Sequence, residues 1–147
     1  MYNLNQAQLL RESLRLLVRK LGVLERGEAS CCDITLSQCQ TIVEIGRAGT
    51  MSVNLLAEIL GVDKSTVSRS VDKLANNGVL VRETDPEDRR YVTLRLSDKG
   101  QSIFVDIEKR MTLYFEEVIA ALPGDKRDQI VESLQYLVHA LKGSRCC

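Results

Sequence analysis

The sequence predicts a mainly α-helical protein with one small β-hairpin. Near both ends of the chain, leucine, valine and isoleucine recur at spacings of three and four residues, as they do along one face of a helix. In the middle, short apolar segments begin at capping residues and end at glycine, which is typical of shorter helices. A later segment alternates β-branched and polar residues on either side of an acidic turn, which predicts two paired strands.

The composition is that of one domain, or of one domain with dimerisation arms. The chain has 147 residues, of which 44% are hydrophobic and 4% aromatic, with no tryptophan, so we expect an aliphatic core. The formal net charge of zero argues against a nonspecific polycation but allows a local basic surface. No secretion signal or membrane-length apolar run is visible, so we expect a cytoplasmic protein that binds no membrane.

The first part of the chain predicts a long helix, a loop and a second helix. The long helix is expected over residues 5–26, and the stretch "GEASCCD", residues 27–33, is expected to be a loop. Thr35 and Gln38 then have the spacing of a capping box, and the helix that they open is expected to end near Arg47.

Two short helices are expected next. A helix over residues 52–60 ends at Gly61, and Asp63 caps a second helix that ends at Asn77 and Gly78.

A hairpin and two more helices complete the predicted elements. The hairpin strands are expected over residues 79–84 and 90–97, around the turn "DPEDR". A long helix over residues 98–122 follows, and Pro123 and Gly124 separate it from a last helix.

The order helix, three-residue break, helix, hairpin predicts a helix-turn-helix followed by a wing. Val67, Val71 and Leu74 share one side of the second helix and should face the core. Short hydroxyl side chains on the other side would let the backbone approach DNA, and arginine is long enough to reach a guanine edge or a phosphate. The candidate DNA contacts of this helix are Lys64, Ser65, Thr66, Ser68, Arg69 and Lys73. A solvated surface would also explain this polar face alone, but the contiguous order of the elements favours DNA binding.

The turn of the hairpin supplies Arg89 and Arg90 directly after Asp88. A narrow minor groove concentrates negative potential, which attracts arginine. Asp88 could fix one of these arginines by a bidentate pair, so we regard it as the support of the wing.

The block from Leu55 to Gly100 resembles the MarR family of dimeric winged-helix transcription regulators. The matching motifs are "LAEILGVDKSTVSRSVDKLANNGVLVR", the wing "DPEDRR" and the exit "LSDKG". The resemblance implies a winged helix-turn-helix at residues 35–97, with residues 1–34 and 98–147 forming a dimerisation region. It also implies that Arg90 is the minor-groove arginine of the wing, with the arginine before it as an auxiliary contact.

The same resemblance implies a homodimer that binds double-stranded DNA with a near-palindromic operator. Such regulators are usually repressors that a ligand, a metal or an oxidant releases from DNA. The sequence fits a dimer independently, because the apolar stripes of the terminal helices exceed what a small winged helix can bury.

The cysteines raise the question of an effector, because four of the five come as adjacent pairs. Thiolates select soft ions, and a helix N-terminus stabilises a thiolate, so the first hypothesis is a soft metal or metalloid site. No cofactor is required, and the candidate effectors are arsenite, mercury, copper(I), zinc and cadmium. The candidate ligands are Cys31, Cys32, Cys39, Cys146 and Cys147.

Other interpretations of the cysteines stay open. The thiols could sense oxidants through a disulfide from Cys31 or Cys32 to Cys39 or to the C-terminal pair. Cys39 could instead be a packing residue, because Ile34 and Cys39 occupy the positions of a hydrophobic staple around the capping box. A regulator of this kind with an organic small-molecule effector is a further alternative.

Enzymatic function is not predicted. The sequence has no Gly-rich phosphate loop, no Ser/His/Asp set and no H-E-x-x-H motif, and its one histidine, His139, offers little for acid–base chemistry. A winged helix that binds another protein is the better rival, but it would not need Ser65, Thr66, Arg69 and Arg90 on the DNA side.

Overall fold

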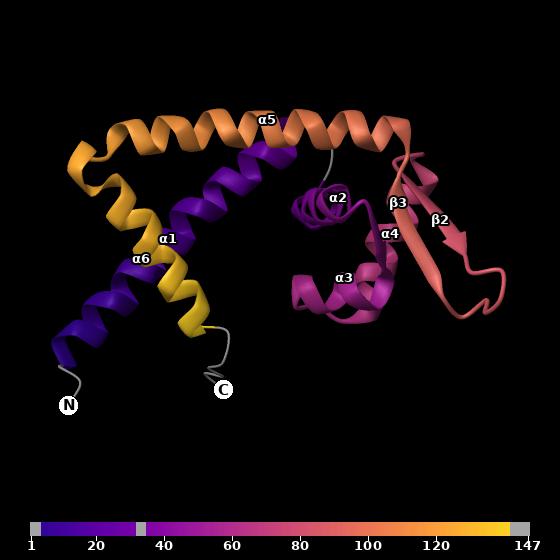
Figure 1. Ribbon diagram of the computed structural model, residues 1–147, viewed down its shortest axis with the longest axis horizontal. Coiled ribbons are helices and arrows are strands. Elements are labelled where there is room, and N and C mark those ends of the chain that lie inside the picture. Colours follow the sequence, from indigo (N-terminus) through magenta and orange to yellow (C-terminus); the bar gives the residue numbers. More distant parts are fainter. Residues whose placement is uncertain (1–3, 32–34, 142–147) are drawn as a thin grey trace. The chain divides into compact units, whose positions relative to one another are not determined.

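The computed structural model describes the backbone of residues 4–31 and 35–141, and the side chains of residues 5–21, 35 and 37–141. The chain divides into two compact units, residues 1–104 and residues 105–147. Figure 1 labels helices α1 to α6 and strands β2 and β3.

The first helix, α1, spans Leu4–Cys31 and is longer than predicted. The helix expected over residues 5–26 is confirmed, but the loop expected over residues 27–33 is wrong as far as Cys31. Gly27 costs a helix interior about 1 kcal/mol relative to alanine, whereas the glutamate and alanine that follow it are good helix formers and no proline interrupts the segment. The glycine therefore does not end the helix.

The second helix, α2 (Leu36–Ala48), begins at the capping box that the sequence predicts. Thr35 Oγ1 accepts a hydrogen bond from the Gln38 amide at 3.2 Å, and the Thr35 amide donates to Gln38 Oε1 at 3.0 Å. Two backbone donors at the start of the helix are thus satisfied by side chains.

Helices α3 (Val53–Leu60) and α4 (Lys64–Asn76) follow as the predicted pair. Ser52 caps α3, which ends at Gly61, where a φ of 66° lies in the left-handed region that glycine adopts without penalty. Asp63 caps α4, so only a short turn separates the two helices.

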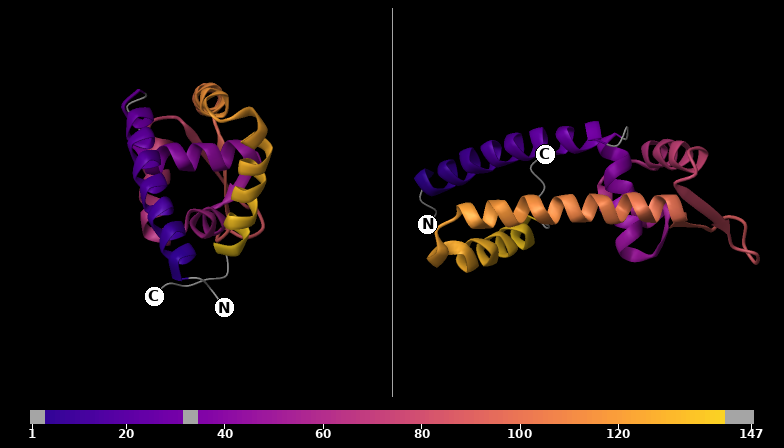
Figure 2. Two further views of the ribbon diagram at one scale, coloured as in Figure 1. Left: turned by 90° about the vertical axis from the view of Figure 1, so that its left-hand side faces the viewer. Right: turned by 90° about the horizontal axis from the view of Figure 1, so that it is seen from above.

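The hairpin consists of β2 (Leu80–Thr84) and β3 (Val92–Leu96), which pair antiparallel as predicted. A strand that the sequence did not predict, β1 (Thr50–Ser52), pairs with the other edge of β3, so the sheet order is β1-β3-β2. A strand of three residues is too short to show an alternating pattern. Figure 2 shows the hairpin extending away from α3 and α4, with its turn at the tip.

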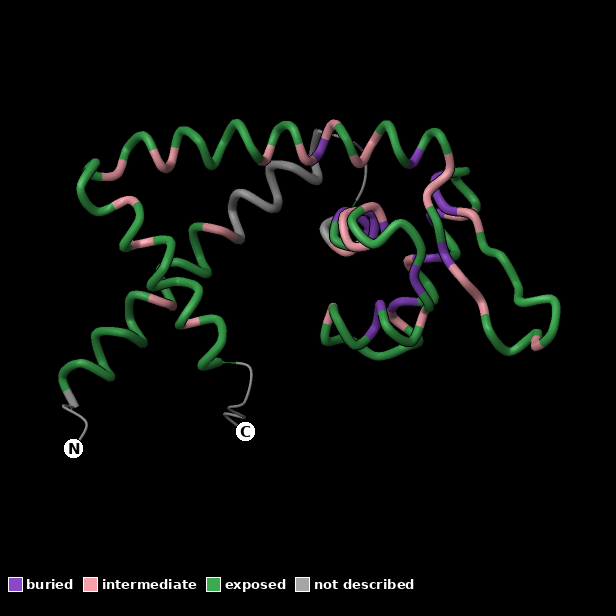
Figure 3. Tube along the Cα trace, viewed as in Figure 1, coloured by how far each residue is buried: buried purple, intermediate pink, exposed green. Residues whose placement is uncertain are grey.

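An aliphatic core joins α2, α3, α4 and the sheet, and no aromatic side chain is among the buried core residues of the described part of the chain. The largest fully buried apolar side chains are Ile42, Ile45, Leu56, Val67, Val71, Leu74 and Leu94. In Figure 3 most buried positions lie in these elements and a few lie in α5, whereas the described side chains of α1 are intermediate or exposed. The predicted aliphatic core is therefore confirmed.

Two helices follow the sheet. Helix α5 (Asp98–Ala121) begins after Ser97, whose Oγ accepts a hydrogen bond from the Gly100 amide at 3.1 Å. A short 3-10 turn, η1 (Gly124–Lys126), leads into α6 (Arg127–Leu141). The predicted break between the last two helices is therefore confirmed. Within the described residues, no helix is both long and apolar enough to cross a membrane.

Replacing Gly100 by alanine is expected to destabilise the fold. A Cβ atom there would collide with the carbonyl oxygen of Val79, and a backbone atom cannot move aside as a flexible side chain can. Overpacking costs about 1–3 kcal/mol, part of which the better helix propensity of alanine offsets. The urea midpoint of Gly100→Ala should therefore fall. Gly124→Ala is the control, because its added Cβ meets open space. Equal midpoints for the two variants would contradict the close packing at Gly100.

Candidate nucleic-acid interface

Helix α4 has a buried face and a polar face. Val67 and Val71 are 2% exposed and Leu74 is fully buried, as the sequence predicts. The predicted DNA contacts lie outside this core, Thr66 half-buried and the others exposed: Lys64, Ser65, Ser68, Arg69 and Lys73. The polar side chains of this helix are therefore accessible from solvent.

Asp63 organises the first turn of α4. Its carboxylate accepts the Thr66 amide hydrogen at 3.2 Å, the Thr66 hydroxyl proton at 2.6 Å and the Ser65 hydroxyl proton. These hydrogen bonds, first that of the Ser65 hydroxyl, hold the pKa of Asp63 well below its ordinary value of 3.8, so the carboxylate is ionised at neutral pH. The sequence predicts the cap, but not that both hydroxyls donate to it.

Arg69 lies against the same turn. Its Nε donates to the Ser65 carbonyl oxygen at 3.3 Å, which holds the base of the guanidinium close to the helix start. The terminal nitrogens of arginine form the planar fork that fits a guanine edge or a phosphate. Arg69 is thus placed beside Ser65 on the exposed face of α4.

The tip of the hairpin holds Arg90 in a fixed geometry. Its Nε donates to Asp88 Oδ1 and its Nη2 to Asp88 Oδ2, each at 3.0 Å, which is a bidentate pair. The Arg90 amide also donates to Asp88 Oδ1 at 3.1 Å. The arginine lowers the pKa of Asp88, and the carboxylate raises the pKa of Arg90, so both groups stay charged at neutral pH. The Arg90 side chain is 89% exposed and projects into solvent.

The turn of the wing is closed by backbone and side-chain hydrogen bonds. Asp85 Oδ1 accepts from the Glu87 amide at 2.8 Å, and the Asp85 amide donates to the Tyr91 carbonyl oxygen at 2.9 Å. Tyr91 is 64% exposed beside Arg90 and was not predicted as a contact. The sequence signal for this contact is an aromatic residue next to the wing arginine. The hydroxyl group of Tyr91 can donate a hydrogen bond to a phosphate.

Ion pairs connect the strands of the wing with each other and with α4. Arg82 of β2 lies 2.8 Å from Asp72 of α4, measured from Nη1 to Oδ1. Arg95 of β3 lies 2.6 Å from Glu83 of β2, measured from Nε to Oε1. Exposed ion pairs add little stability, so these two pairs contribute less to the position of the hairpin than the buried core does.

Of the candidate cysteine ligands, Cys39 alone has a described side chain, which is 7% exposed within α2. Cys31 is the last residue of α1, and its side chain lies outside the described residues, as do Cys32, Cys146 and Cys147. Among the described side chains, no group of three His, Cys, Asp or Glu residues is placed to hold a metal ion. The metal hypothesis therefore stays a prediction.

A helix-turn-helix with an exposed polar second helix, followed by a hairpin with an arginine at its tip, defines the class of winged helix-turn-helix DNA-binding proteins. Comparison with known proteins indicates one family within this class. A sequence model of the MarR family matches residues 33–90. The HTH-type transcriptional regulator YfiV of Bacillus subtilis is 25% identical over 113 residues, which cover 77% of this chain and 71% of that protein.

Solved structures show the same architecture. Streptococcus pneumoniae FabT in complex with DNA has a TM-score of 0.81 and 25% identity, covering 92% of this chain and 97% of FabT. A MarR family protein from Bacillus stearothermophilus has a TM-score of 0.86 and 20% identity, covering 96% and 99% of the two chains, which bears on the fold alone. The chain therefore resembles the MarR family of winged helix-turn-helix transcription regulators in its fold and in the sequence of residues 33–90.

The cap of α4 predicts a dependence of stability on pH. Because folding lowers the pKa of Asp63, the ionised cap stabilises the fold fully above about pH 4, and this stabilisation is lost as the pH falls further. Asp63→Asn keeps a capping acceptor but has no charge to lose. The thermal midpoint of the wild type, followed by circular dichroism, should fall more steeply than that of Asp63→Asn between about pH 5 and pH 2. If the thermal midpoints of the two proteins fall in parallel over this pH range, the charge of the Asp63 cap does not stabilise the fold.

Proposed function

We propose that this chain acts as a homodimeric transcriptional repressor that binds a near-palindromic site in double-stranded DNA. The observation that carries the proposal is the bidentate Asp88–Arg90 pair at the wing tip. An exposed ion pair adds little to stability. We therefore explain the geometry of the Asp88–Arg90 pair as preorganisation of an exposed arginine for a negatively charged partner, rather than as a contribution to stability.

In this proposal each protomer contacts DNA at two places. The N-terminal half of α4 enters the major groove, where Arg69 reaches a guanine edge or a phosphate. The wing places Arg90 in the minor groove, whose negative potential attracts arginine. Lys64, Lys73 and Arg89 neutralise phosphates and make the affinity dependent on salt.

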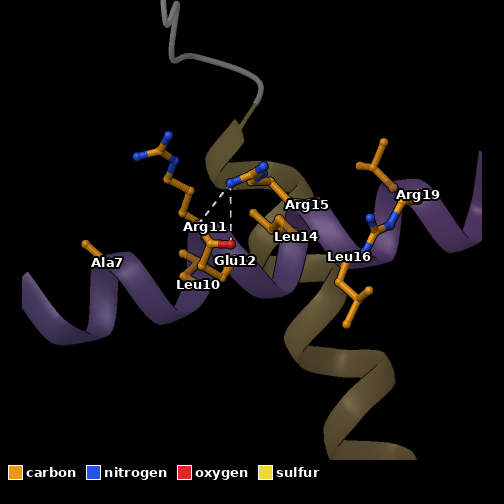
Figure 4. A pocket seen from close by; sticks show the side chains of 9 residues that line it. Ala7, Leu10, Arg11, Glu12, Leu14, Arg15, Leu16 and Arg19 are labelled. Atoms are coloured by element: carbon orange, nitrogen blue, oxygen red, sulfur yellow. Dashed lines mark hydrogen bonds and ion pairs between the residues drawn. The ribbon is translucent and has the colours of Figure 1, made fainter.

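The proposed dimer uses the apolar faces of the terminal helices. Large apolar side chains that are exposed in the single chain are Leu9, Leu10, Leu16, Leu17 and Val18 on α1, Val105, Leu113, Tyr114 and Phe115 on α5, and Val131, Leu134, Tyr136, Val138 and Leu141 on α6. Figure 4 shows part of the α1 face, with Leu10, Leu14 and Leu16 among arginine side chains. Soluble monomers rarely expose so much apolar surface, so a second copy of the chain is the expected cover.

The proposed effector is a soft metal or metalloid bound by cysteine thiolates. The candidate ligands are Cys31, Cys32 and Cys39, with Cys146 and Cys147 as further candidates. A hydrogen bond between Ser37 of α2 and Ser70 of α4, with 3.0 Å between their hydroxyl oxygens, supports a route from such a site to the DNA. Since Ser37 and Cys39 lie in the first turns of α2, a change in ligation there would reach the recognition helix through one side-chain contact.

Loss of the wing arginine should weaken DNA binding. Arg90→Ala is expected to reduce the affinity for the preferred duplex by about 5- to 100-fold at matched salt, because an intimate groove contact is lost. Fluorescence anisotropy would measure this affinity, with DNA taken from upstream of the gene that encodes the protein. Arg110→Ala is the control, because it removes the same charge from α5, where Arg110 pairs with Asp106. Equal affinities of the two variants would rule out the role assigned to Arg90.

A negative charge introduced on the apolar face of a terminal helix should dissociate the proposed dimer. Val18 of α1 and Val138 of α6 are 68% and 57% exposed in the single chain, so aspartate at either position is harmless unless a second copy covers it. Light scattering after size exclusion should give the mass of a monomer for Val18→Asp and for Val138→Asp. Leu55→Asp on α3, which lies outside the proposed interface, should stay dimeric. A dimer for all three variants would exclude these helices as the interface.

The cysteine variants should identify the effector class. Arsenite, mercury, copper(I), zinc or cadmium should release the reduced wild-type protein from DNA, whereas Cys31→Ser, Cys32→Ser and Cys39→Ser variants should stay bound. Release by a hydroperoxide in the absence of metal, lost in the same variants, would favour oxidant sensing instead. If every variant responds to both treatments like the wild type, these three thiols are not the sensor, and the C-terminal cysteine pair or an organic effector is the remaining candidate.

A further inference from the structure

The hydroxyl groups at the start of α4 donate their protons to the carboxylate that caps this helix. Ser65 and Thr66 both donate to the Asp63 carboxylate, Thr66 at 2.6 Å between its Oγ1 and Asp63 Oδ1. An ionised carboxylate can only accept hydrogen bonds, so each hydroxyl must act as the donor in its bond to Asp63. The low pKa of Asp63 keeps the carboxylate in this ionised form.

A hydroxyl group has one proton and two lone pairs. Once the proton points at Asp63, the oxygens of Ser65 and Thr66 can only accept a hydrogen bond from another partner. Phosphate oxygens and the N7, O6 and O4 atoms of base edges are acceptors too, so they cannot bond these hydroxyls directly. The donors in the major groove are the amino groups of adenine N6 and cytosine N4.

The charge at this turn favours the same partners. The carboxylate of Asp63 lies beside the two hydroxyls, where it would repel a phosphate. Its negative charge strengthens the hydrogen bond that each hydroxyl oxygen accepts, because a hydroxyl that donates to a carboxylate becomes a better acceptor. The first turn of α4 is thus suited to a base edge rather than to the DNA backbone.

We propose that Asp63 determines sequence specificity by making Ser65 and Thr66 obligate acceptors, so that the first turn of α4 selects a base pair with an adenine or cytosine amino group in the major groove. This inference rests on the proposed DNA binding and refines it. Asp63 acts as a positioning residue, and the hydroxyl oxygens make the contact. Arg69, which lies against Ser65, would read the neighbouring position.

The test begins with selection of bound sequences from a random-duplex library by the full-length wild type, Asp63→Asn, Ser65→Ala and Thr66→Val. Asp63→Asn keeps the helix cap, but its amide can donate to the hydroxyls and leave their protons free for DNA. Glu58→Gln on α3 is the control for loss of one negative charge from a neighbouring exposed position. Circular dichroism establishes that each variant is folded before selection.

Ser65→Ala and Asp63→Asn should lose the preference for adenine or cytosine at the same base pair, while the control keeps the wild-type preference. A second measurement uses the selected duplex with that one amino group removed, as purine in place of adenine or 2-pyrimidinone in place of cytosine. The wild type should lose about 3- to 10-fold in affinity, the size of one neutral hydrogen bond, and Ser65→Ala should lose little more. Comparing both proteins on both duplexes cancels the effect of the altered base on the duplex itself.

The outcomes separate this inference from the function on which it rests. If the wild type selects a sequence but Asp63→Asn and Ser65→Ala select the same one, Asp63 does not determine specificity and the inference is wrong. Equal loss of affinity by the wild type and Ser65→Ala on removal of the amino group would overturn it as well. If the wild type selects no sequence at all, the proposed operator binding fails, and the inference fails with it.

Discussion

The aliphatic core shared by α2, α3, α4 and the sheet is the constraint on which the candidate DNA surface depends. Helix α4 buries Val67, Val71 and Leu74 in this core, and the fixed helical period then decides which side chains point outward. Leu94 in the middle of β3 is buried in the same core and anchors the hairpin. One packing arrangement therefore orients both the polar face of α4 and the wing that carries Arg90.

Two acidic residues give this surface its local geometry. An acidic side chain beside DNA is unfavourable on charge alone. We therefore explain the presence of each acid by the side chains that hydrogen-bond to it. Asp88 fixes the Arg90 guanidinium by two hydrogen bonds, and Asp63 orients the hydroxyls of Ser65 and Thr66. In both cases the carboxylate is occupied by donors of its own chain, which preorganises the neighbouring groups for a partner. Under the proposed DNA binding, the two acids would favour different targets, phosphates and the minor groove at the wing and base edges at α4.

Much of this arrangement could be predicted from the sequence, because helix periods, caps and turn residues act locally. The capping box at Thr35, the cap at Asp63 and the buried row of α4 are examples. Strand β1 could not be predicted, since its three residues gain their structure only by pairing with β3. The helical structure of residues 27–31 is not predicted from the sequence, because a glycine such as Gly27 is a weak helix former. The direction of the Ser65 and Thr66 protons depends on three-dimensional hydrogen bonds, and the spacing of residues does not encode it.

Nuclear magnetic resonance can test the claim that α4 and the wing form the DNA-reading surface. Backbone amide signals of the isotope-labelled protein would be followed during titration with a duplex that it binds specifically, at fixed salt. We expect the largest shifts at Ser65, Thr66 and Arg69 in α4 and at Arg90 and Tyr91 in the wing, with a scrambled duplex giving smaller shifts in α4. Shifts that are confined to α6, or that are identical for both duplexes, would contradict the claim.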